Sequence, residues 1–479
     1  MTLRDLARPA GLRRAVRLAA PLALGAWLMT GCVSGPVTPA QLAQSHPPAP
    51  GWQAPRPHDG QMAQLSEWWR QQGDAELVQL IDAAQKASPS VAASLARIDQ
   101  ARAQQAQAGG ALLPVVNAQA QTLRAKSPAQ SLAQQSQATL QWHWELDLIG
   151  AAKVANDAAK GQVESAQAQW HEARVLVAAE VATRYHGLRS CTQQSERMTR
   201  EWGSRQETLR LSGLSAKAGL ISQQEEAQVA LLVEEGRSRL ASLQAQCEVQ
   251  WKALTALTAI PEPELRGRLK EALSREASPT PFGISAVPAD VLSQRPDVYS
   301  AAREVMMAQA QERQALAVRL PRLSLDGFVG RARVASGAQV LQGPTWSFGP
   351  LAVSLPVFDA GQRAAQQAAA QSGVTAALSQ YQSSVRQAVR EVEEALVQLS
   401  ATETRWQSAQ ASRDAARRLL AAQERLHGQG LLSSVQLEEA RRSAWAAEMA
   451  ELDLQAQRHQ AWIQLYRAVG GGFSPARPA

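Results

Sequence analysis

The chain has 479 residues, of which 5% are aromatic and 45% hydrophobic, a balance that suits long helices packed along narrow seams better than several thick globular cores. The formal net charge of +7 is uneven, because residues 1–31 hold five arginines and one acid and leave 44 basic and 41 acidic side chains elsewhere. With no long basic block in the remainder, the sequence excludes nucleic acid as a partner.

Residues 1–31 have the pattern of a bacterial export signal, with arginines ahead of an apolar run from Leu18 to Met29. The run leads into Thr30-Gly31-Cys32, and a small pair directly before a cysteine resembles the lipobox of bacterial lipoproteins, although Met29 stands where that pattern prefers Leu. The resemblance implies cleavage before Cys32 and fatty acylation of that residue. Because Val33 follows in place of Asp, it also implies the outer membrane. The alternative is a single-span anchor, but the run is shorter than the ~20 residues that a spanning helix needs.

A proline-rich segment over residues 32–73 is expected to be an extended, lipid-anchored tether, since its prolines cannot continue a helix. The rest of the chain is predicted to be a duplication. Two Pro-to-Pro helical intervals, Pro89–Pro114 and Pro296–Pro321, have equal length and lie 207 residues apart. We therefore predict repeats over 74–283 and 284–472, followed by a tail over 473–479.

In the first repeat, two strands are predicted over about 112–125 and 136–147. Alternation in the second strand sets Leu140, Trp142 and Trp144 on one side and Gln141 and His143 on the other. The polar stretch from Lys126 to Gln135 is expected to connect them. One apolar and one polar face per strand is typical of a membrane β-barrel, and a soluble sheet is the alternative.

In the second repeat, strands are predicted over about 320–335 and 345–358. Leu323 and Leu325 share one phase, whereas Phe328 and Val334 follow the other, and the switch falls near Gly327. We therefore expect a β-bulge at that glycine.

Each repeat continues into a long helical hairpin, predicted over about 150–258 and 362–469. No proline interrupts Gln362–His427, which as a helix would span roughly 100 Å. A stripe of Leu378, Val385, Val389, Val392, Leu396 and Leu399 has coiled-coil spacing, which we interpret as packing.

The two hairpin turns repeat one motif. Gly219 and Gly430 suit the left-handed conformation that ends a helix, and Ser222 with Glu225, and Ser433 with Gln436, have the spacing of capping boxes that start the returning helix.

Several motifs on this duplicated frame together resemble the TolC-like outer-membrane factors paired with resistance-nodulation-division pumps. These motifs are Trp68-Trp69, Ala96-Arg97-Ile98 through Leu113-Pro114, Trp144 through Gly150, Pro288 through Leu292, Arg295 through Val298, Pro356 through Gly361 and Leu465 through Gly472. The fold class that the resemblance implies is an α+β membrane protein whose strand-strand-helix-helix repeat forms a homotrimer. Its twelve-stranded outer-membrane barrel would continue into a periplasmic α-helical barrel, with a belt that includes Ile260–Pro288 at the waist.

The implied function is a passive duct for small molecules such as drugs, working in the outer membrane with a periplasmic adaptor and an inner-membrane pump. The alternative within the family is a duct for an ATP-driven exporter or for type I protein secretion. A periplasmic adaptor would have one hairpin and lipoyl-like strands, and a lipid-anchored coiled coil would not explain the alternating strand with Trp142 and Trp144. The chain contains no HExxH, P-loop or CxxC spacing, so we expect no catalytic site, no metal and no cofactor apart from the lipid on Cys32.

Functional residues are expected at the hairpin tips. Residues predicted to form the tips and contact an adaptor are Gly219, Leu220, Ser222, Glu225, Gly430, Leu431, Ser433 and Gln436. The second hairpin is predicted to carry the gate, with Val435 as an apolar constriction and Glu439 and Arg442 as an ionic lock. A solvated pair on one helix is the alternative for the two charged residues.

Cys191 lies 28 residues before Gly219 and Cys247 lies 28 residues after it. Equal distances from an antiparallel turn bring residues to the same height, and the periplasm is oxidising, so a Cys191–Cys247 disulfide is predicted. Two buried cysteines on unrelated faces are the alternative.

Overall fold

The computed structural model describes residues 41, 68–71, 73–127, 130–274, 292, 295–336 and 339–473. All of these belong to one compact unit, Pro39–Ala479, and the signal segment with Cys32 lies outside the described residues. The short helix α3 (Trp68–Gln71) precedes the first repeat and lies in the segment that was expected to be extended. The first repeat contains α4 (Ala75–Ala87), α5 (Pro89–Gly110), β1 (Val115–Ser127), β2 (Gln130–Leu146), α6 (Ala151–Lys217), α7 (Gln223–Thr258) and α8 (Glu262–Ser274). The second contains α10 (Pro296–Ala317), β3 (Arg322–Ser336), β4 (Gln339–Ser354), α11 (Gln362–Gly428), α12 (Ser434–Ala468) and the short 3₁₀-helix η2 (Gly470–Gly472).

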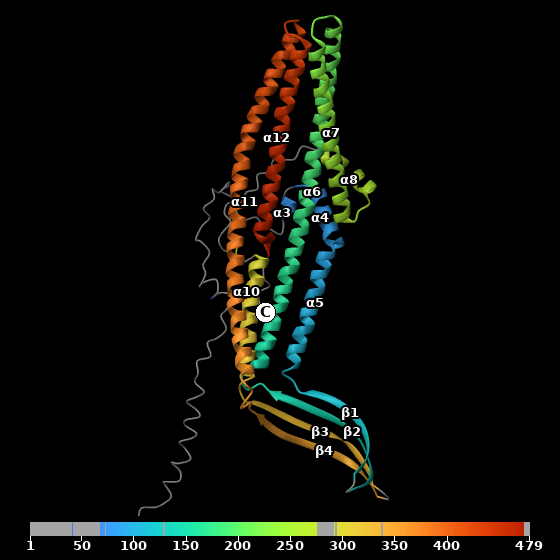
Figure 1. The fold of residues 1–479 in the computed structure, drawn as a ribbon, viewed down its shortest axis with the longest axis vertical. Coiled ribbons are helices and arrows are strands. Elements are labelled where there is room, and N and C mark those ends of the chain that lie inside the picture. The colour runs from blue at the N-terminus through green and yellow to red at the C-terminus, as the bar shows by residue number, and fades with distance from the viewer. Residues whose placement is uncertain are drawn as a thin grey trace, which may run out of the picture. The chain divides into compact units, whose positions relative to one another are not determined.

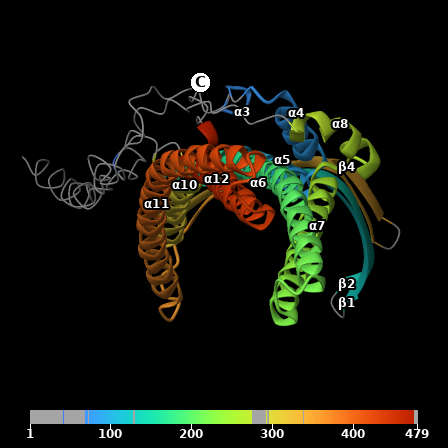
Figure 2. The same cartoon turned by 90° about the horizontal axis from the view of Figure 1, so that it is seen from above.

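The long helices lie side by side, as Figures 1 and 2 show. Helices α6 and α11 have 67 residues each, so each is roughly 100 Å long. Helix α7 returns along α6, α12 returns along α11, and α12 also packs against α6. Near the sheet, α5 packs along the part of α6 that α7 does not reach, and α10 packs between α6 and α11. Viewed along the helices, they form a curved layer rather than a bundle around one core (Figure 2).

The largest apolar cluster lies where α3, α4 and α8 meet the long helices. It includes the fully buried side chains Leu77, Leu188, Leu254, Leu265 and Leu465. Each such side chain contributes about 1.5–3 kcal/mol by leaving water. The predicted stripe on α11 is confirmed as packing: Val392, Leu396 and Leu399 join this cluster, and Leu378, Val385 and Val389 pack against a second one around Val305 and Tyr381.

Two buried polar networks secure the same region. In the first repeat, the Asp74 carboxylate caps α4 through the Leu77 N–H and accepts hydrogen bonds from the Tyr185 hydroxyl (2.8 Å) and the Arg189 guanidinium (2.8 Å). The pKa of Tyr185 is raised, because burial and the negative charge of Asp74 outweigh the positive charge of Arg189. The Tyr185 hydroxyl therefore stays protonated and acts as the donor. Helix α4 is thereby tied to α6.

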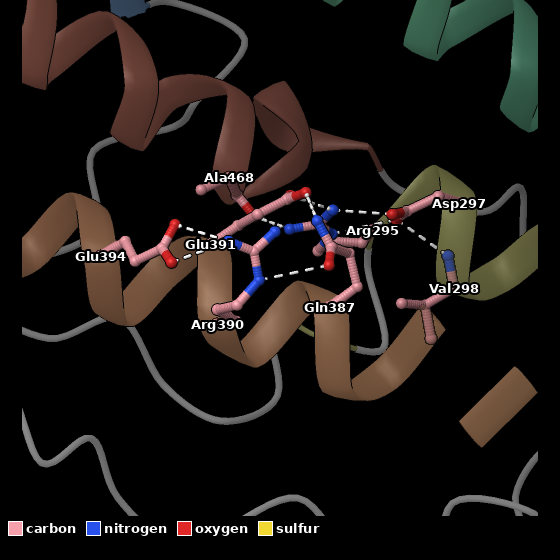
Figure 3. A network of polar contacts seen from close by, with 8 residues as sticks. All are labelled: Arg295, Asp297, Val298, Gln387, Arg390, Glu391, Glu394 and Ala468. Atoms are coloured by element: carbon pink, nitrogen blue, oxygen red, sulfur yellow. Dashed lines mark hydrogen bonds and ion pairs between the residues drawn. The ribbon is translucent and has the colours of Figure 1, made fainter. Parts of the chain in front are cut away.

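In the second repeat, Arg295 ties α10, α11 and α12 together (Figure 3). Its side chain is 6% exposed and forms ion pairs of 2.7 Å with both Asp297 and Glu391, and it donates to the Ala468 carbonyl oxygen (2.7 Å). A buried guanidinium requires this many acceptors, because an unpaired charge there would be strongly destabilising. The Arg-Pro-Asp and Leu-Tyr-Arg-Ala motifs therefore meet at one structural joint.

The four strands form one antiparallel sheet in the order β1-β2-β3-β4. Strand pairing places the predicted apolar residues of β2 in rows with those of β1 and β3, since Leu140 lies opposite Ala118 and Val329, and Trp144 lies opposite Leu325. We call this surface the apolar band: Val116, Ala118, Leu140, Trp142, Trp144, Leu146, Leu323, Leu325, Val329, Trp346, Phe348, Leu351 and Val353. The band is partly exposed in the single chain, with Trp346 at 75% and Phe348 at 74%. Among the described helices, none is long and apolar enough to cross a bilayer.

The expected β-bulge near Gly327 is present, and its extra residue lies on the partner strand β4. The pairing of β3 with β2 is continuous, and the register shift lies between β3 and β4, where Leu325 pairs with Leu351 and Gly327 with Phe348. The additional residue thus belongs to β4, at Gly349-Pro350. This shift lets Trp346 and Phe348 share the apolar band with Leu351, whereas Phe328 and Val334 do lie on the other face.

Gly327 has a different reason to be glycine. A Cβ atom there would lie 2.1 Å from the Trp142 ring and 2.7 Å from the Ser347 carbonyl oxygen. The indole of Trp142 therefore lies across the backbone of β3, in the space that any other side chain at this position would need.

The strands are longer than predicted at their hairpin ends. The polar stretch expected to connect the first pair is mostly strand, since β1 continues to Ser127 and β2 begins at Gln130. Likewise β4 begins at Gln339 and ends at Ser354, earlier than expected at both ends. Backbone pairing does not require amphipathic alternation, so a Gln- and Ser-rich extension can lengthen a hairpin without the pattern used to detect it.

Candidate functional site at the hairpin tips

The two hairpin tips are built alike. Gly219 (φ 71°) and Gly430 (φ 74°) adopt the left-handed conformation, and the following N–H groups of Leu220 and Leu431 donate to the carbonyl oxygens of Ser215 and Leu426. This is the hydrogen bonding of a Schellman motif, in which glycine avoids the strain of a positive φ. The predicted left-handed turns are confirmed.

Both predicted capping boxes are confirmed as well. The Ser222 hydroxyl accepts from the Glu225 N–H, and the Glu225 carboxylate accepts from the Ser222 N–H at 2.8 Å; Ser433 and Gln436 do the same for α12. Leu220 and Leu431 occupy matching positions between glycine and serine and are 77% and 71% exposed. Each tip is therefore a rigid turn that presents an exposed leucine.

Below the tips, α12 meets α6 along a polar seam. Ser204 and Thr208 lie four residues apart on one face of α6, and both are buried. The Ser204 hydroxyl donates to the Glu438 carboxylate, and the Arg442 guanidinium donates to the Thr208 hydroxyl at 3.0 Å. We call these two contacts, with their four residues, the α6–α12 latch.

Glu438 is the acid of the latch and was missed in the sequence. It is 5% exposed and forms an ion pair of 2.6 Å with Arg441. The neighbouring Glu439, which was expected to pair with Arg442, is exposed, and its carboxylate has no ion pair among those of the described residues. Burial and the nearby Arg205 lower the pKa of Arg442, and the negative charges of Glu439 and Glu438 oppose that shift. Within one chain, the predicted Glu439–Arg442 ion pair is therefore not formed: Arg441 pairs with Glu438, and Arg442 donates to Thr208.

The seam had a signal in the sequence, because Ser204, Thr208 and Ser212 recur at four-residue intervals on α6 and all three are buried. A stripe of small polar residues is the surface on which a facing helix can place charged groups with hydrogen-bond partners. Val435, the predicted constriction, is 36% exposed beside the tip.

Further from the tips, ion pairs join α12 to its neighbours. Arg413 contacts Glu451 at 2.6 Å, and Glu448 contacts both Arg417 at 2.7 Å and Arg197 of α6 at 3.4 Å. In the first hairpin, Cys191 of α6 and Cys247 of α7 are joined by a disulfide with a Cα–Cα distance of 5.6 Å. The geometry is thus the one that the equal spacing from Gly219 predicts. No cluster of metal-ligating side chains occurs within the described part of the chain.

Comparison with known proteins extends over most of the chain. The family model described as outer membrane efflux protein matches residues 80–259 and 287–471, one segment in each repeat. The chain is 27% identical over 455 residues to the pyoverdine export outer membrane protein OpmQ of Pseudomonas putida, covering 92% of this chain and 95% of that protein. It is 26% identical to the toluene efflux pump outer membrane protein TtgI of the same species, with 84% and 86% covered.

Solved structures share the fold. The CmeC outer membrane channel of Campylobacter jejuni superposes with a TM-score of 0.74 at 23% identity, covering 86% of this chain and 89% of that one. VceC of Vibrio cholerae gives 0.71 at 22% identity, covering 85% and 99%. The duplicated strand and hairpin plan, the sheet with its apolar band and the two-segment family match together show that the chain belongs to the outer membrane efflux protein family, as a channel component of an outer-membrane efflux system.

Proposed function

We propose that this protein is the outer-membrane duct of a tripartite efflux system and passes small molecules without chemical change. The observation that carries the proposal is the continuity of each repeat from an amphipathic strand pair into a helical hairpin whose first helix is roughly 100 Å long. The relatives named for toluene efflux and for pyoverdine export support small organic molecules as the cargo class. An inner-membrane pump would supply both the energy and the selection.

The functional unit is a homotrimer. A single chain leaves β1 and β4 as sheet edges, and exposed edges together with an exposed apolar band are unfavourable in isolation. Four strands cannot close a barrel, and a water-filled duct needs more than the roughly eight strands that merely enclose packed side chains. Three copies give twelve strands and leave no edge.

The chain is also anchored by lipid on Cys32. The arginine-rich, apolar segment before Thr30-Gly31-Cys32 supports this, since the covalent lipid adds a membrane signal to the barrel. Intact-mass measurement of the purified protein should find a chain that begins at an acylated Cys32. An unmodified Cys32, or a chain that begins upstream of it, would refute the anchor.

The duct is closed at the hairpin tips by the second hairpin. The α6–α12 latch holds α12 against α6, and Val435 with Glu439 stands on the exposed side of α12 next to it. Around a threefold axis, three copies of Val435 would present an apolar constriction that offers no partner to a hydrated ion. Opening requires α12 to move, which breaks the contacts of Glu438 and Arg442 with α6.

The adaptor binds at the same end. Leu220 and Leu431 are large, exposed and held on rigid turns, which are the properties of anchor residues in an interface. A periplasmic adaptor with its own helical hairpin would contact these tips.

The test is efflux by cells that lack their own outer-membrane duct. Expressed together with its adaptor and pump, this protein should lower the accumulation of a fluorescent pump substrate and raise resistance to small organic toxicants. A variant with Leu220→Asp and Leu431→Asp should lose this effect while still forming trimers in the outer membrane. If the unaltered protein forms trimers there and export does not increase, or if a secreted protein appears in the medium instead, the proposal fails.

A further inference from the structure

The half of the sheet next to the hairpin loops is basic and holds no acid. Residues 118–139 and 329–346 include Arg124, Lys126, Arg331 and Arg333, and neither segment contains Asp or Glu. These segments lie at the end of the sheet opposite the helices, because all four strands join helices at their other ends.

The acids of the strands cannot neutralise this charge. They are Glu145 and Asp326, which lie at the helix end of the sheet and on the face opposite the apolar band. Both already have partners, since Glu145 contacts Arg322 at 3.8 Å and Asp326 contacts His143 at 2.7 Å. Five residues of extended strand, about 16 Å, separate Asp326 from Arg331.

Three of the basic residues lie on the same face as the apolar band and continue it toward the loops. The row of Leu140 and Val329 is followed by Ala138 with Arg331, then by Ser136 with Arg333, and then by Gln134 with Arg124. Successive rows are about 6.7 Å apart. All three arginines are exposed, and the Thr122 hydroxyl donates to that of Ser136 (3.1 Å) on the middle row. Cationic donors thus begin one row beyond Leu140 and Val329, at the loop end of the apolar band.

A second copy of the chain does not supply the missing acid. A neighbour in a closed barrel places its β4 beside this β1, and both strands are free of acids over their whole length. The strands on either side of a subunit boundary therefore offer the arginines no acidic partner. In the proposed outer-membrane barrel, the surface that faces the apolar band is the lipid.

We propose that Arg124, Arg331 and Arg333 bind the phosphate groups of phosphorylated lipids in the leaflet nearest the hairpin loops. Acyl chains would lie on the apolar band, and the headgroups would then reach the arginine rows. The planar guanidinium matches a phosphate in bidentate geometry and remains charged at any physiological pH. The lipid site rests on the proposed function in one respect, because it requires the sheet to be part of a barrel in the outer membrane. It does not depend on which molecule the duct exports.

The experiment is native mass spectrometry of the full-length trimer in detergent with two matched lipids, diphosphoryl lipid A and its dephosphorylated form. The unaltered protein should retain the phosphorylated lipid in preference to the other. An R331Q/R333Q variant should bind it about tenfold more weakly, because it loses two charge-assisted contacts. The matched control is R322Q on the same strand, at the helix end and on the opposite face, and its lipid binding should be unchanged.

Four results would overturn the proposal. Equal retention of both lipids would show that acyl chains alone are recognised. Unchanged binding by R331Q/R333Q would place the lipid elsewhere, and competition by millimolar inorganic phosphate as strong as that by the lipid would indicate a site for a free anion. Loss of the trimer in R331Q/R333Q would assign the arginines to assembly. Efflux activity does not enter the measurement, so failure of the lipid site leaves the proposed function untouched.

Discussion

The two helical hairpins share one plan and are held together by different chemistry. Between α6 and α7 the cross-link is covalent, at Cys191–Cys247. Between α11 and α12 it is ionic, with Arg413–Glu451, Arg417–Glu448 and Arg458–Glu403 at 2.6, 2.7 and 3.0 Å. The first hairpin cannot separate without breaking a bond, whereas the second is held by groups that water can replace. If the proposed gate opens by movement of one hairpin, the ionic contacts of the second make it the one that can move.

The largest expected effect is on the first hairpin alone. Replacing both cysteines, C191S/C247S, should lower the free energy of opening by about 4 kcal/mol, as chain entropy gives for a closed segment of 56 residues. Amide hydrogen exchange in α6 and α7 near these residues should accelerate by about a thousandfold. Exchange in α11 near Arg413 is the internal control and should not change. Equal acceleration of both hairpins, or of neither, would contradict the comparison.

The next effect concerns the latch. Glu438→Ala leaves Ser204 without its buried acceptor and removes one partner of Arg441, so α12 should become less stable against α6 by about 1–3 kcal/mol. Glu439→Ala is the matched control, since its exposed side chain has no such contacts, and it should change the stability by less than about 0.5 kcal/mol. Amide exchange at the start of α12 measures both. If Glu439→Ala has the larger effect, the acid of the latch is misassigned.

The contact between the hairpins near α4 should depend on pH. His186 of α6 and His459 of α12 stack with ring centroids 4.2 Å apart, and burial lowers the pKa of His459 to about 4 and that of His186 well below its usual range. Above pH 6.5 these histidines are neutral in both the folded and the unfolded chain. As the pH falls from about 6.5 toward 4, the unfolded chain binds protons that the folded chain does not, so the folded state loses stability. The loss is at most about 1.4 kcal/mol per pH unit for each histidine.

Thermal unfolding between pH 7 and pH 5 should follow that slope, and H459N, which leaves only His186 of the pair to titrate, should reduce it by roughly half. A slope that persists unchanged in H459N would show that groups other than His459 cause it.

The smallest expected effect is on the ion pairs of the second hairpin, which the first hairpin, with its disulfide, does not share. Glu448→Gln removes ion pairs with Arg417 and Arg197, which should cost about 0.5–1 kcal/mol and be weaker at high salt. The control Glu394→Gln removes the exposed pair with Arg390 within α11 and should have almost no effect. Local exchange in α12 at low and high salt distinguishes them. A salt dependence as large in α7 as in α12 would remove the contrast.

Much of the fold could be predicted because its helix ends, turns and strands are determined by residues close together in the sequence. Pro89 and Pro296, the glycine and serine of each turn and the alternation around Trp142 each report on their own neighbourhood, and the structure has helices, turns and strands there. The bulge was expected near Gly327, where the register does shift, but the strand that carries the extra residue, β4 at Gly349-Pro350, can be assigned only when the pairing is known. The hairpin ends of the strands were missed because Gln and Ser carry little pattern.

The candidate site was predicted less completely. Gly430, Ser433 and Gln436 follow from capping rules, but the acid of the latch depends on which face of α12 meets α6. Glu438 and Glu439 are adjacent, so their side chains differ by about 100° around the helix, and a small rotation decides which one is buried. Sequence spacing placed the charge within one residue, and only the packing of Leu437, Ala440 and Ala444 selects Glu438.

Single-channel conductance in planar bilayers tests most directly whether the second hairpin, held by the α6–α12 latch, closes the duct. The variant E438A/R442A should assemble as a trimer and conduct more than the unaltered protein, and Val435→Ala should enlarge the constriction without disturbing assembly. Glu439→Ala and the reduced disulfide should leave the closed state nearly unchanged. If E438A/R442A and Val435→Ala both form trimers that conduct like the parent, the gate does not lie at the second hairpin.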